Sequence, residues 1–363
     1  MKKILFIINN LGSGGAQRQI VTVAKLIKKK GNEVTVLCYS PQDFFYTELQ
    51  NENIPVCWKI EKNALLRIIK VRNYVRKGHY DAVVSFLHTE NILNVLSSLG
   101  GKKWIVICGE RSAKEGIFDT RRGKIHGWLM RFADAIVCNS ENARRMWMRH
   151  YPSYKNKYSV IYNNVQIGDL TTTYAPQIQQ KIRIVIAASY QYLKNPLGLV
   201  EGVRLLSKEE QERLQIDWYG RREVVAGDTK AYDEMNQLIK RYKLNNVFQL
   251  HEENRDILNI MNQADAVGLF SWVEGLPNCI CEAMMLGKPV VMTRVSDYSV
   301  LIDKDNGFLC DWNDYHSIKE AVTALLNKDE MHLLEMGEAS KRKAQMLFSE
   351  EIVTNKWMNL IEG

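Results

Sequence analysis

Short continuous runs of apolar residues alternate with amphipathic stretches along the whole chain. In the first half, apolar runs occupy residues 4–8, 34–38, 82–86, 104–108 and 135–138, and stretches such as 17–30 and 65–77 repeat at helical spacing. The pattern restarts after residue 165, with apolar runs at 183–188, 215–219, 247–250, 266–270, 289–293 and 307–310. Continuous apolar strands separated by helices are typical of parallel sheets covered on both faces. The sequence therefore predicts two doubly wound α/β domains that bind ligands at the carboxyl ends of their strands.

Length and composition agree with a two-domain protein. The 363 residues exceed one ordinary core, and a hydrophobic content of 46% argues against disorder. The segment 166–180 is polar and aperiodic, as expected for a linker between domains. The seven cysteines are odd in number and scattered, which indicates buried thiols in a reducing compartment and not a disulfide or zinc framework.

The lengths of the apolar runs indicate where in the cell the protein is located. The first run is short and no small-residue cleavage site follows it, so we expect a buried first strand and not a signal peptide. No stretch reaches the roughly eighteen apolar residues of a membrane-spanning helix. The expected localisation is cytoplasmic, with any membrane contact peripheral.

The charge is unevenly distributed between the two halves. Residues 1–165 contain 27 Lys and Arg against 12 Asp and Glu, a net charge of +15, and the remaining residues carry −7 of the total +8. A basic first half predicts an anionic partner for that half alone. No helix-turn-helix, zinc-finger or aromatic RNA-binding pattern accompanies the charge, so nucleic acid is not expected. An anionic membrane surface or a phosphorylated acceptor fits better.

The segment 271–290 holds the most informative residues of the chain. Glu274 stands in a predicted loop, Pro277 suits the first position of a helix of about ten residues, and Gly287 ends that helix. Glu282 then lies inside the helix. The first helical amides form a ready anion site between the two carboxylates, which could accept sugar hydroxyls. Taken singly, each glutamate could equally be a helix-dipole or solvated residue.

The whole string resembles a known signature. Glu-Gly-Leu-Pro-Asn, a second glutamate eight positions after the first, and then Pro-Val-Val-Met are similar to the E-x7-E signature of the retaining GT-B glycosyltransferases called glycosyl transferases group 1. The resemblance implies two Rossmann-like domains that face each other across a cleft, with the last helix crossing back onto the first domain. It implies an N-terminal acceptor domain at 1–168 with 346–363, and a donor domain at 169–345. It assigns Glu274 to the sugar hydroxyls and Glu282 to the ribose of the donor.

A glycine-rich turn follows the first predicted strand. It reads Asn9-Asn10-Leu11-Gly12-Ser13-Gly14-Gly15-Ala16-Gln17, and glycines in such a turn let the backbone approach a ligand closely. The turn lacks the third glycine of the dinucleotide fingerprint, so alone it could be a simple tight turn. It is similar to the Gly-Gly-Ala-Glu loop of the family, with Gln17 in place of the usual glutamate. In the family this loop borders the acceptor and the donor phosphates.

The first strand of the second half is followed by Ser189-Tyr190-Gln191-Tyr192-Leu193-Lys194. The family usually places an arginine just after this strand and a lysine several residues later, both on the donor diphosphate. Lys194 matches the second element, but the arginine is missing near Ser189 or Tyr190. Either Lys194 acts with helix amides alone, or Arg221 or Arg222 reaches the diphosphate.

The catalytic side of the first half departs further from the family. Many relatives carry a histidine after the strand at 104–108, whereas this chain has Gly109-Glu110-Arg111-Ser112. Glu110 or Arg111 therefore stands near the expected acceptor position, and His88 is the nearest alternative. No His, Cys or Asp cluster has metal-ligand spacing, and no nucleophile elbow is present, so neither a metal site nor that class of hydrolase is expected.

These observations predict a retaining, metal-independent glycosyltransferase of the hexosyltransferase type, without a cofactor. It would transfer a sugar from a nucleotide-diphosphate sugar, most often a UDP-sugar, to a hydroxyl of a glycan or lipid-linked acceptor in surface polysaccharide biosynthesis. The alternatives are a non-catalytic nucleotide-sugar or glycan-binding protein of this fold and a nucleotide-dependent oxidoreductase. The predicted catalytic residues are Glu274, Lys194, Glu110 and His88. The predicted donor-binding residues are Gly15, Ser189, Lys194, Arg222, Glu274, Gly275, Leu276, Pro277, Asn278 and Glu282, and those on the acceptor side are Gly14, Gln17 and Arg111.

Three basic and apolar segments of the first half predict peripheral attachment to the inner face of the cell membrane. The stretch 64–77 places Leu65, Ile68, Ile69, Arg72 and Arg76 at helical spacings. The apolar residues of that stretch could instead pack on the sheet. The basic segment 121–124 lies beside Trp-Leu-Met at 128–130, and the arginines at 144–145 lie beside Trp and Met at 147–148. Such pairings suit the headgroup region of an anionic bilayer.

Overall fold

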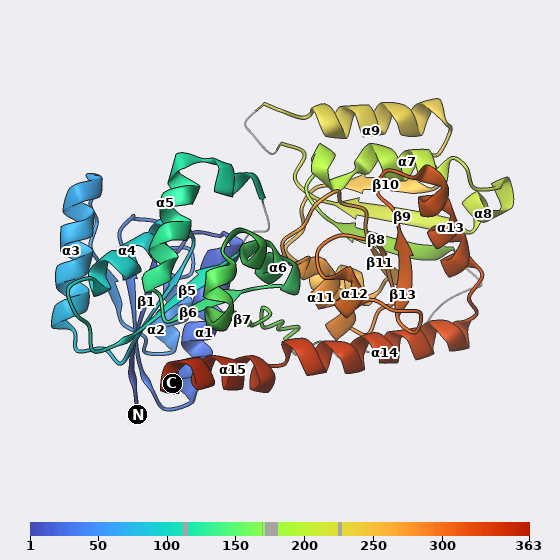
Figure 1. Cartoon of the computed structure of the whole chain (residues 1–363). Helices are drawn as coiled ribbons and strands as arrows, with labels where there is room; N and C mark the ends of the chain where they lie inside the picture. The colour runs from blue at the N-terminus through green and yellow to red at the C-terminus, as the bar shows by residue number, and fades with distance from the viewer. Residues whose placement is uncertain (112–114, 169, 171–180, 224–226) are drawn as a thin grey trace. The chain divides into compact units, whose positions relative to one another are not determined.

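The computed structural model describes residues 1–111, 115–168, 170, 181–223 and 227–363. The chain divides into two compact units (Figure 1). Unit 1 comprises residues 1–164 and 348–363, and unit 2 comprises residues 165–347. Most of the expected linker at 166–180 lies outside the described residues.

Unit 1 is built on a seven-stranded sheet in which all the strand pairs are parallel. The strand order is β3-β2-β1-β4-β5-β6-β7. The five apolar runs of the sequence analysis form strands, whereas β3 and β7 have three residues each and no apolar run long enough to predict them. The strands are β1 (Lys3–Ile8), β2 (Glu33–Cys38), β3 (Val56–Trp58), β4 (Ala82–Phe86), β5 (Ile105–Glu110), β6 (Ala135–Cys138) and β7 (Tyr158–Val160).

Helices cover both faces of the unit 1 sheet, which explains the unbroken apolar strands. One core lies between the sheet and α1, α2 and the C-terminal α15, and a second lies between the sheet and α3, α4, α5 and α6. The helices are α1 (Gly15–Lys29), α2 (Tyr46–Asn51), α3 (Ala64–Lys77), α4 (His88–Ser98), η1 (Glu115–Asp119), α5 (Arg121–Leu129), η2 (Met130–Phe132), α6 (Glu141–His150) and η3 (Pro152–Lys157).

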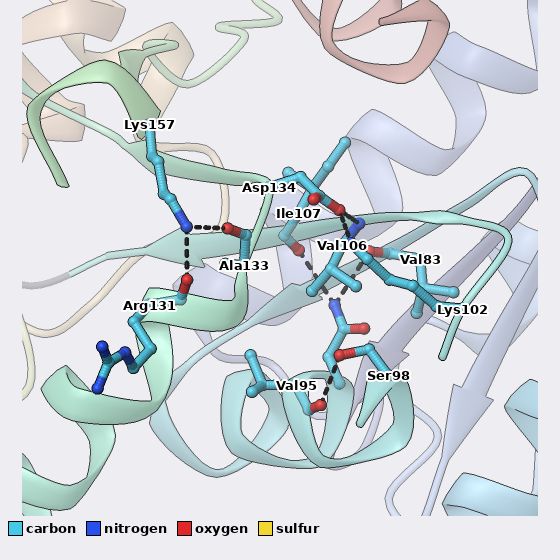
Figure 2. A network of polar contacts seen from close by, with 11 residues as sticks. Val83, Val95, Ser98, Lys102, Val106, Ile107, Arg131, Ala133, Asp134 and Lys157 are labelled. Carbon is cyan, nitrogen blue, oxygen red and sulfur yellow. Dashed lines mark hydrogen bonds and ion pairs between the residues drawn. The ribbon is translucent and has the colours of Figure 1, made fainter. Parts of the chain in front are cut away.

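Buried polar side chains join the middle strands of this sheet. The amide nitrogen of Asn94 on α4 donates to the carbonyls of Val83 and Ile107, at 3.0 and 3.3 Å, on two neighbouring strands. Figure 2 shows the adjoining contacts: Asp134 accepts from the backbone N–H of Val106 at 2.7 Å, and the Lys157 ammonium donates to carbonyls at the end of η2. The bonds of Asn94 pair an amide that is 0% exposed, whose burial would otherwise be unfavourable.

Unit 2 repeats the architecture with a six-stranded parallel sheet of order β10-β9-β8-β11-β12-β13. Its strands are β8 (Ile182–Ala187), β9 (Leu214–Tyr219), β10 (Phe248–His251), β11 (Ala266–Leu269), β12 (Val290–Thr293) and β13 (Gly307–Cys310). Its helices are η4 (Tyr192–Lys194), α7 (Pro196–Val203), α8 (Lys208–Glu212), α9 (Lys230–Arg241), α10 (Ile257–Asn262), α11 (Asn278–Met285), α12 (Tyr298–Leu301) and α13 (Tyr315–Leu326). The core between the sheet and α7, α9 and α13 is continuous.

The end of the chain returns to unit 1. After α14 (Glu330–Phe348), Ser349 caps the N-terminus of α15 (Glu350–Glu362) by accepting a hydrogen bond from the N–H of Ile352. Trp357 on α15 is 1% exposed and packs against Phe86, with ring centroids 5.8 Å apart. The C-terminal helix is therefore part of the core of unit 1. None of the described helices is long and apolar enough to span a membrane.

Both sheets reverse their strand order at one place. In unit 1 the chain leaves β1 toward one edge and returns at β4 on its other side, and in unit 2 the same reversal separates β8 from β11. Loops that leave adjacent strands at such a point diverge to opposite faces of the sheet. They leave an opening where ligands bind in open α/β sheets.

Candidate functional site

Two loops of unit 2 meet at the carboxyl ends of β8 and β11. The backbone N–H of Trp272 donates to the carbonyl of Leu193 at 2.8 Å, which joins the loops directly. The Lys194 ammonium lies 2.5 Å from Oε1 of Glu274, and the hydroxyl of Ser271 donates to the same oxygen at 2.7 Å. Both members of the ion pair are largely buried, with side chains 20% and 13% exposed. The Glu274 carboxylate is thus fixed in position at the switch point of the sheet.

The turn that carries Lys194 has a specific backbone conformation. Asn195 follows it with φ +59° and ψ +45°, in the left-handed region that asparagine adopts more readily than most residues. Pro196 then occupies the first position of α7, where its missing N–H leaves no donor unpaired. The side-chain amide of Asn195 donates to the carbonyl of Trp312 at 2.8 Å, so the loop after β13 is tied to the same turn.

The loop after Glu274 leads into α11. Pro277 is the capping residue and α11 has eight residues, whereas the sequence analysis expected Pro277 inside a helix of about ten. The prediction was wrong at this boundary because Pro277 has ψ 89°, outside the helical range. The carbonyl of Gly275 accepts a hydrogen bond from Ser296, Leu276 is buried, and Asn278 begins the helix at the surface. Glu282 lies half-buried on α11, four residues after Asn278.

Three other residues near the predicted diphosphate site contact protein groups other than the Lys194–Glu274 pair. The hydroxyl of Tyr190, which stands where the family arginine was sought, lies 2.8 Å from the carbonyl of Trp218 in the core. Ser189 accepts a hydrogen bond from the Gln191 amide at 2.8 Å. The Nε atom of Arg222 lies 2.6 Å from a carboxylate oxygen of Glu252.

Arg221 has a carboxylate partner as well. Its Nε atom lies 3.5 Å from Glu253, and this pair is exposed. The two arginines are therefore engaged with the loop after β10, and the structure does not bring either one to the Lys194–Glu274 pair.

The glycine-rich turn of unit 1 lies at the carboxyl end of β1. The Gln17 amide donates to the Asn9 side chain at 3.0 Å, so Gln17 folds back over the turn. A Cβ atom at Gly14 would lie 2.3 Å from Oε1 of Gln17, whereas one at Gly15 would meet no heavy atom within 4 Å. Gly14 is therefore needed for the position of Gln17, and Gly15 leaves open space at the start of α1.

His88 and Glu110 belong to one buried cluster at the ends of β4 and β5. The connecting residue is His126 on α5, whose ring lies 3.9 Å from that of His88 between centroids and whose Nε2 lies 3.2 Å from Glu110. The Asn91 amide also donates to Glu110, at 2.7 Å. The sequence analysis did not identify His126 or Asn91. No spacing pattern relates His126 to a residue 38 positions earlier, so only the fold reveals the cluster.

The environment of this cluster favours neutral imidazole at His88. Burial and the neighbouring His126 lower the pKa of His88 below its ordinary value, and the Glu110 carboxylate opposes this only in part. The preceding residue, Leu87, has φ +79° and ψ 160°, an unusual conformation for a residue with a side chain. Such conformations persist only where the surrounding structure imposes them, often at functional sites.

Arg111 has an internal position beside this cluster. Its guanidinium carbon lies 3.7 Å from the centroid of the Phe86 ring, and Nη1 donates to the Asn163 side chain at 3.1 Å. Burial lowers the pKa of Arg111 to about 9. The residue is thus packed against the end of β4. Among the described residues, no group of three His, Cys, Asp or Glu side chains could hold a metal ion.

The three predicted membrane segments fare differently. On α3, Leu65 is 72% exposed and Leu66 and Ile69 are also exposed, while Arg72 and Arg76 donate to carbonyls at the end of α4. On α5 and η2, Ile125, Trp128 and Phe132 are exposed, and Arg131 lies over the last two rings. The third pairing was wrong. Trp147 is 1% exposed because it lies on the side of α6 that packs in the core. Arg144 is paired with Glu141 at 2.7 Å.

Comparisons with known proteins account for most of the chain. Residues 175–343 match the family model "Glycosyl transferases group 1", and residues 13–168 match the model "Glycosyltransferase Family 4". The chain belongs to the glycosyl transferases group 1 family. The prediction of a glycosyltransferase is thus confirmed, and the oxidoreductase alternative was wrong.

Some relatives of similar length are named for the synthesis of bacterial glycans. The chain is 23% identical to the GalNAc-alpha-(1->4)-GalNAc-alpha-(1->3)-diNAcBac-PP-undecaprenol alpha-1,4-N-acetyl-D-galactosaminyltransferase of Campylobacter jejuni, over 99% of this chain and 98% of that protein. It is 20% identical to the amylovoran biosynthesis glycosyltransferase AmsD of Erwinia amylovora, over 99% and 100% of the two chains.

Solved structures confirm the predicted fold class. The structure of Anabaena HepE in complex with UDP matches with a TM-score of 0.85 and 18% identity over 99% of each chain. A lipopolysaccharide outer core galactosyltransferase, WaaB, matches with a TM-score of 0.78 and 15% identity over 99% of each chain. The glycosyltransferase therefore has the GT-B fold.

We expect the pH dependence of stability to report the state of His88. The folded pKa lies below the unfolded value near 6.5, so the contribution of neutral His88 to stability is full above about pH 6.5 and is lost as the pH falls below it. His88→Asn should therefore reduce the fall in melting temperature between pH 7 and 5. The control is His79→Asn, which alters an exposed loop residue. An unchanged pH profile in His88→Asn would contradict the assignment.

Proposed function

We propose that this glycosyltransferase transfers a sugar from a UDP-sugar to a hydroxyl of a glycan or lipid-linked acceptor, with retention of configuration and without a metal ion. The observation that carries the proposal is the Lys194–Glu274 pair, which lies at the switch point of the unit 2 sheet. It combines a cation suited to a diphosphate with a carboxylate suited to sugar hydroxyls.

The diphosphate, the sugar and the ribose of the donor would each have a partner among these residues. Lys194 and the amides at the start of α11 would hold the diphosphate, because a helix N-terminus favours an anion. Glu274 would accept hydrogen bonds from the sugar hydroxyls, and Glu282, about one turn along α11, would accept them from the ribose. When the nucleoside diphosphate departs, negative charge develops on its terminal phosphate. Groups that are already fixed in place stabilise this charge without reorganising.

Lys194 has a second role before the donor arrives. Its ammonium holds the Glu274 carboxylate, which Ser271 also binds. The carboxylate is therefore oriented before sugar binding, and little side-chain freedom remains to be lost when the donor binds.

Several relatives support the donor and the pathway. HepE has been solved with UDP and with UDP-glucose, and AmsD is named for amylovoran biosynthesis. The Campylobacter relative is named for a glycan on PP-undecaprenol, a lipid carrier. We infer the same class of chemistry for this chain, namely extension of a surface glycan at a lipid-linked or polysaccharide acceptor.

Within unit 1, the acceptor would meet the His88–His126–Glu110 cluster and the open space at Gly15. These groups lie at the carboxyl ends of β4, β5 and β1, the edge at which ligands bind in open α/β sheets. Neutral imidazole at His88 could accept a hydrogen bond from a substrate hydroxyl.

Turnover of a UDP-sugar panel tests the donor assignment. Glu274→Ala and Lys194→Ala should each lower transfer at least about tenfold, since each removes one charge-assisted contact, while Glu282→Ala should chiefly weaken UDP binding. Glu338→Ala is the matched control, because it breaks an exposed pair with Arg342 on α14. Full activity in Glu274→Ala would refute the role of this carboxylate.

Metal independence gives a second measurement. Lys194 and the α11 amides would neutralise the diphosphate, so transfer should continue at an unchanged rate in excess EDTA. The rate should also be insensitive to added magnesium or manganese. Loss of activity on chelation, restored by either ion, would show that the diphosphate charge is compensated differently.

We also propose peripheral attachment to an anionic membrane through unit 1. The exposed apolar side chains of α3 and of α5 with η2, beside a net charge of +15 in residues 1–165, suit the headgroup region. Each cation near such a surface contributes about 1 kcal/mol, and salt screens the attraction. This would place the enzyme beside a lipid-linked acceptor at the inner face of the membrane.

Vesicle sedimentation tests this attachment. The protein should sediment with phosphatidylglycerol vesicles at low salt, not with phosphatidylcholine vesicles, and should be released by roughly half-molar salt. The double variant Leu65→Ser with Leu66→Ser should bind less, whereas Met331→Ser, which alters an exposed side chain of unit 2, should not. Equal binding to both kinds of vesicle would contradict an electrostatic attachment.

A further inference from the structure

Two tryptophans at the carboxyl edge of the unit 2 sheet remain exposed although they contact each other. The rings of Trp272 and Trp312 have centroids 5.4 Å apart at an interplanar angle of 43°, and the residues are 41% and 39% exposed. By contrast, Trp147, Trp218 and Trp357 are at most 1% exposed. Tryptophan is enriched at binding surfaces, so the exposed pair is a candidate surface for a ligand.

Both tryptophans are anchored to the turn that carries Lys194. The backbone N–H of Trp272 donates to Leu193 at 2.8 Å, and the carbonyl of Trp312 accepts from the Asn195 side chain at 2.8 Å. Leu193 and Asn195 are the residues on either side of Lys194. The backbones of the two tryptophans are therefore held next to the ion pair of Lys194 with Glu274, and their rings contact each other.

The neighbouring polar groups indicate the kind of ligand. Trp272 lies two residues before Glu274, so aromatic faces and a fixed carboxylate belong to one short segment. A pyranose presents C–H groups on its ring faces and hydroxyls at its rim. Aromatic rings bind the C–H groups by dispersion, and carboxylate oxygens accept hydrogen bonds from the hydroxyls. A sugar thus complements both parts of this surface.

We propose that Trp272 and Trp312 form an aromatic platform that packs against the pyranose ring of the donor sugar. The inference rests on the proposed function, in which unit 2 binds the donor, and it adds the residues that recognise the sugar portion. All four residues concerned, Trp272, Trp312, Lys194 and Glu274, belong to unit 2. The platform distinguishes sugars by the shape of one ring face and contributes nothing to binding of the nucleotide alone.

Calorimetric titration separates the sugar contribution from that of the nucleotide. The ligands are UDP, UDP-glucose, UDP-galactose, UDP-N-acetylglucosamine and UDP-N-acetylgalactosamine. For the sugar that the wild-type protein binds best, the ratio of the UDP Kd to the UDP-sugar Kd should fall about threefold to tenfold in Trp272→Ala and in Trp312→Ala. The Kd of UDP itself should stay within about twofold of wild type.

Further variants exclude indirect effects. Trp272→Phe keeps an aromatic face and should retain most of the sugar contribution. Leu334→Ala removes a side chain of unit 2 that is 40% exposed, similar to the tryptophans, and should change neither Kd. Thermal melting of each variant checks that the fold is intact, and Trp312→Phe serves if an alanine variant does not fold.

The outcomes are distinct. An unchanged ratio in both alanine variants, with normal UDP binding, would overturn the platform and leave the proposed function standing. Equal loss of UDP and UDP-sugar binding would place the tryptophans on the nucleotide and likewise overturn it. If the wild-type protein bound neither UDP nor any UDP-sugar, the proposed donor would be refuted and the platform with it.

Discussion

The contact between Lys194 and Glu274 joins two loops that are 80 residues apart in the sequence. It forms because β8 and β11 are neighbours in the sheet, although four α-helices and two strands separate them along the chain. The parallel strands bring their carboxyl ends to one edge, so the residues that follow each strand must meet there. A register slip in either strand would move the lysine and the carboxylate apart. Every assignment on the donor side depends on this pairing.

The strands other than β3 and β7 could be predicted because each coincides with an apolar run of the sequence. Runs at 4–8 and 183–188 alternate with amphipathic helices, and such a pattern has few structural solutions. The three-residue strands β3 and β7 carried no comparable signal, since edge strands of that length need little apolar sequence. Pro277 was misplaced by one position, because a proline fixes φ but leaves ψ to the surrounding loop.

Residues of the candidate site could be predicted where they are close in sequence or follow the end of a predicted strand. Glu274 and Glu282 lie on one loop and the helix that follows it, so the sequence shows their spacing directly. Lys194 could be predicted because it follows the end of a predicted strand. His126 and the tryptophan pair depend on contacts between elements far apart in the chain, which spacing does not encode. Trp147 failed as a surface residue for the opposite reason. Its neighbouring arginines suggested exposure, but Trp147 lies on the side of α6 that faces the core.

The position of α15 affects how the protein acquires its structure during synthesis. Val353, Trp357 and Ile361 complete one core of unit 1, whose other buried hydrophobic residues precede residue 165. As the ribosome adds residues from the N-terminus, unit 1 remains with an open apolar face throughout the synthesis of unit 2. Its last helix can dock only after about two hundred further residues have been made. A chaperone that shields this face would act on the nascent N-terminal half, and a truncated product lacking residues 350–362 would expose the same apolar surface to aggregation or proteolysis.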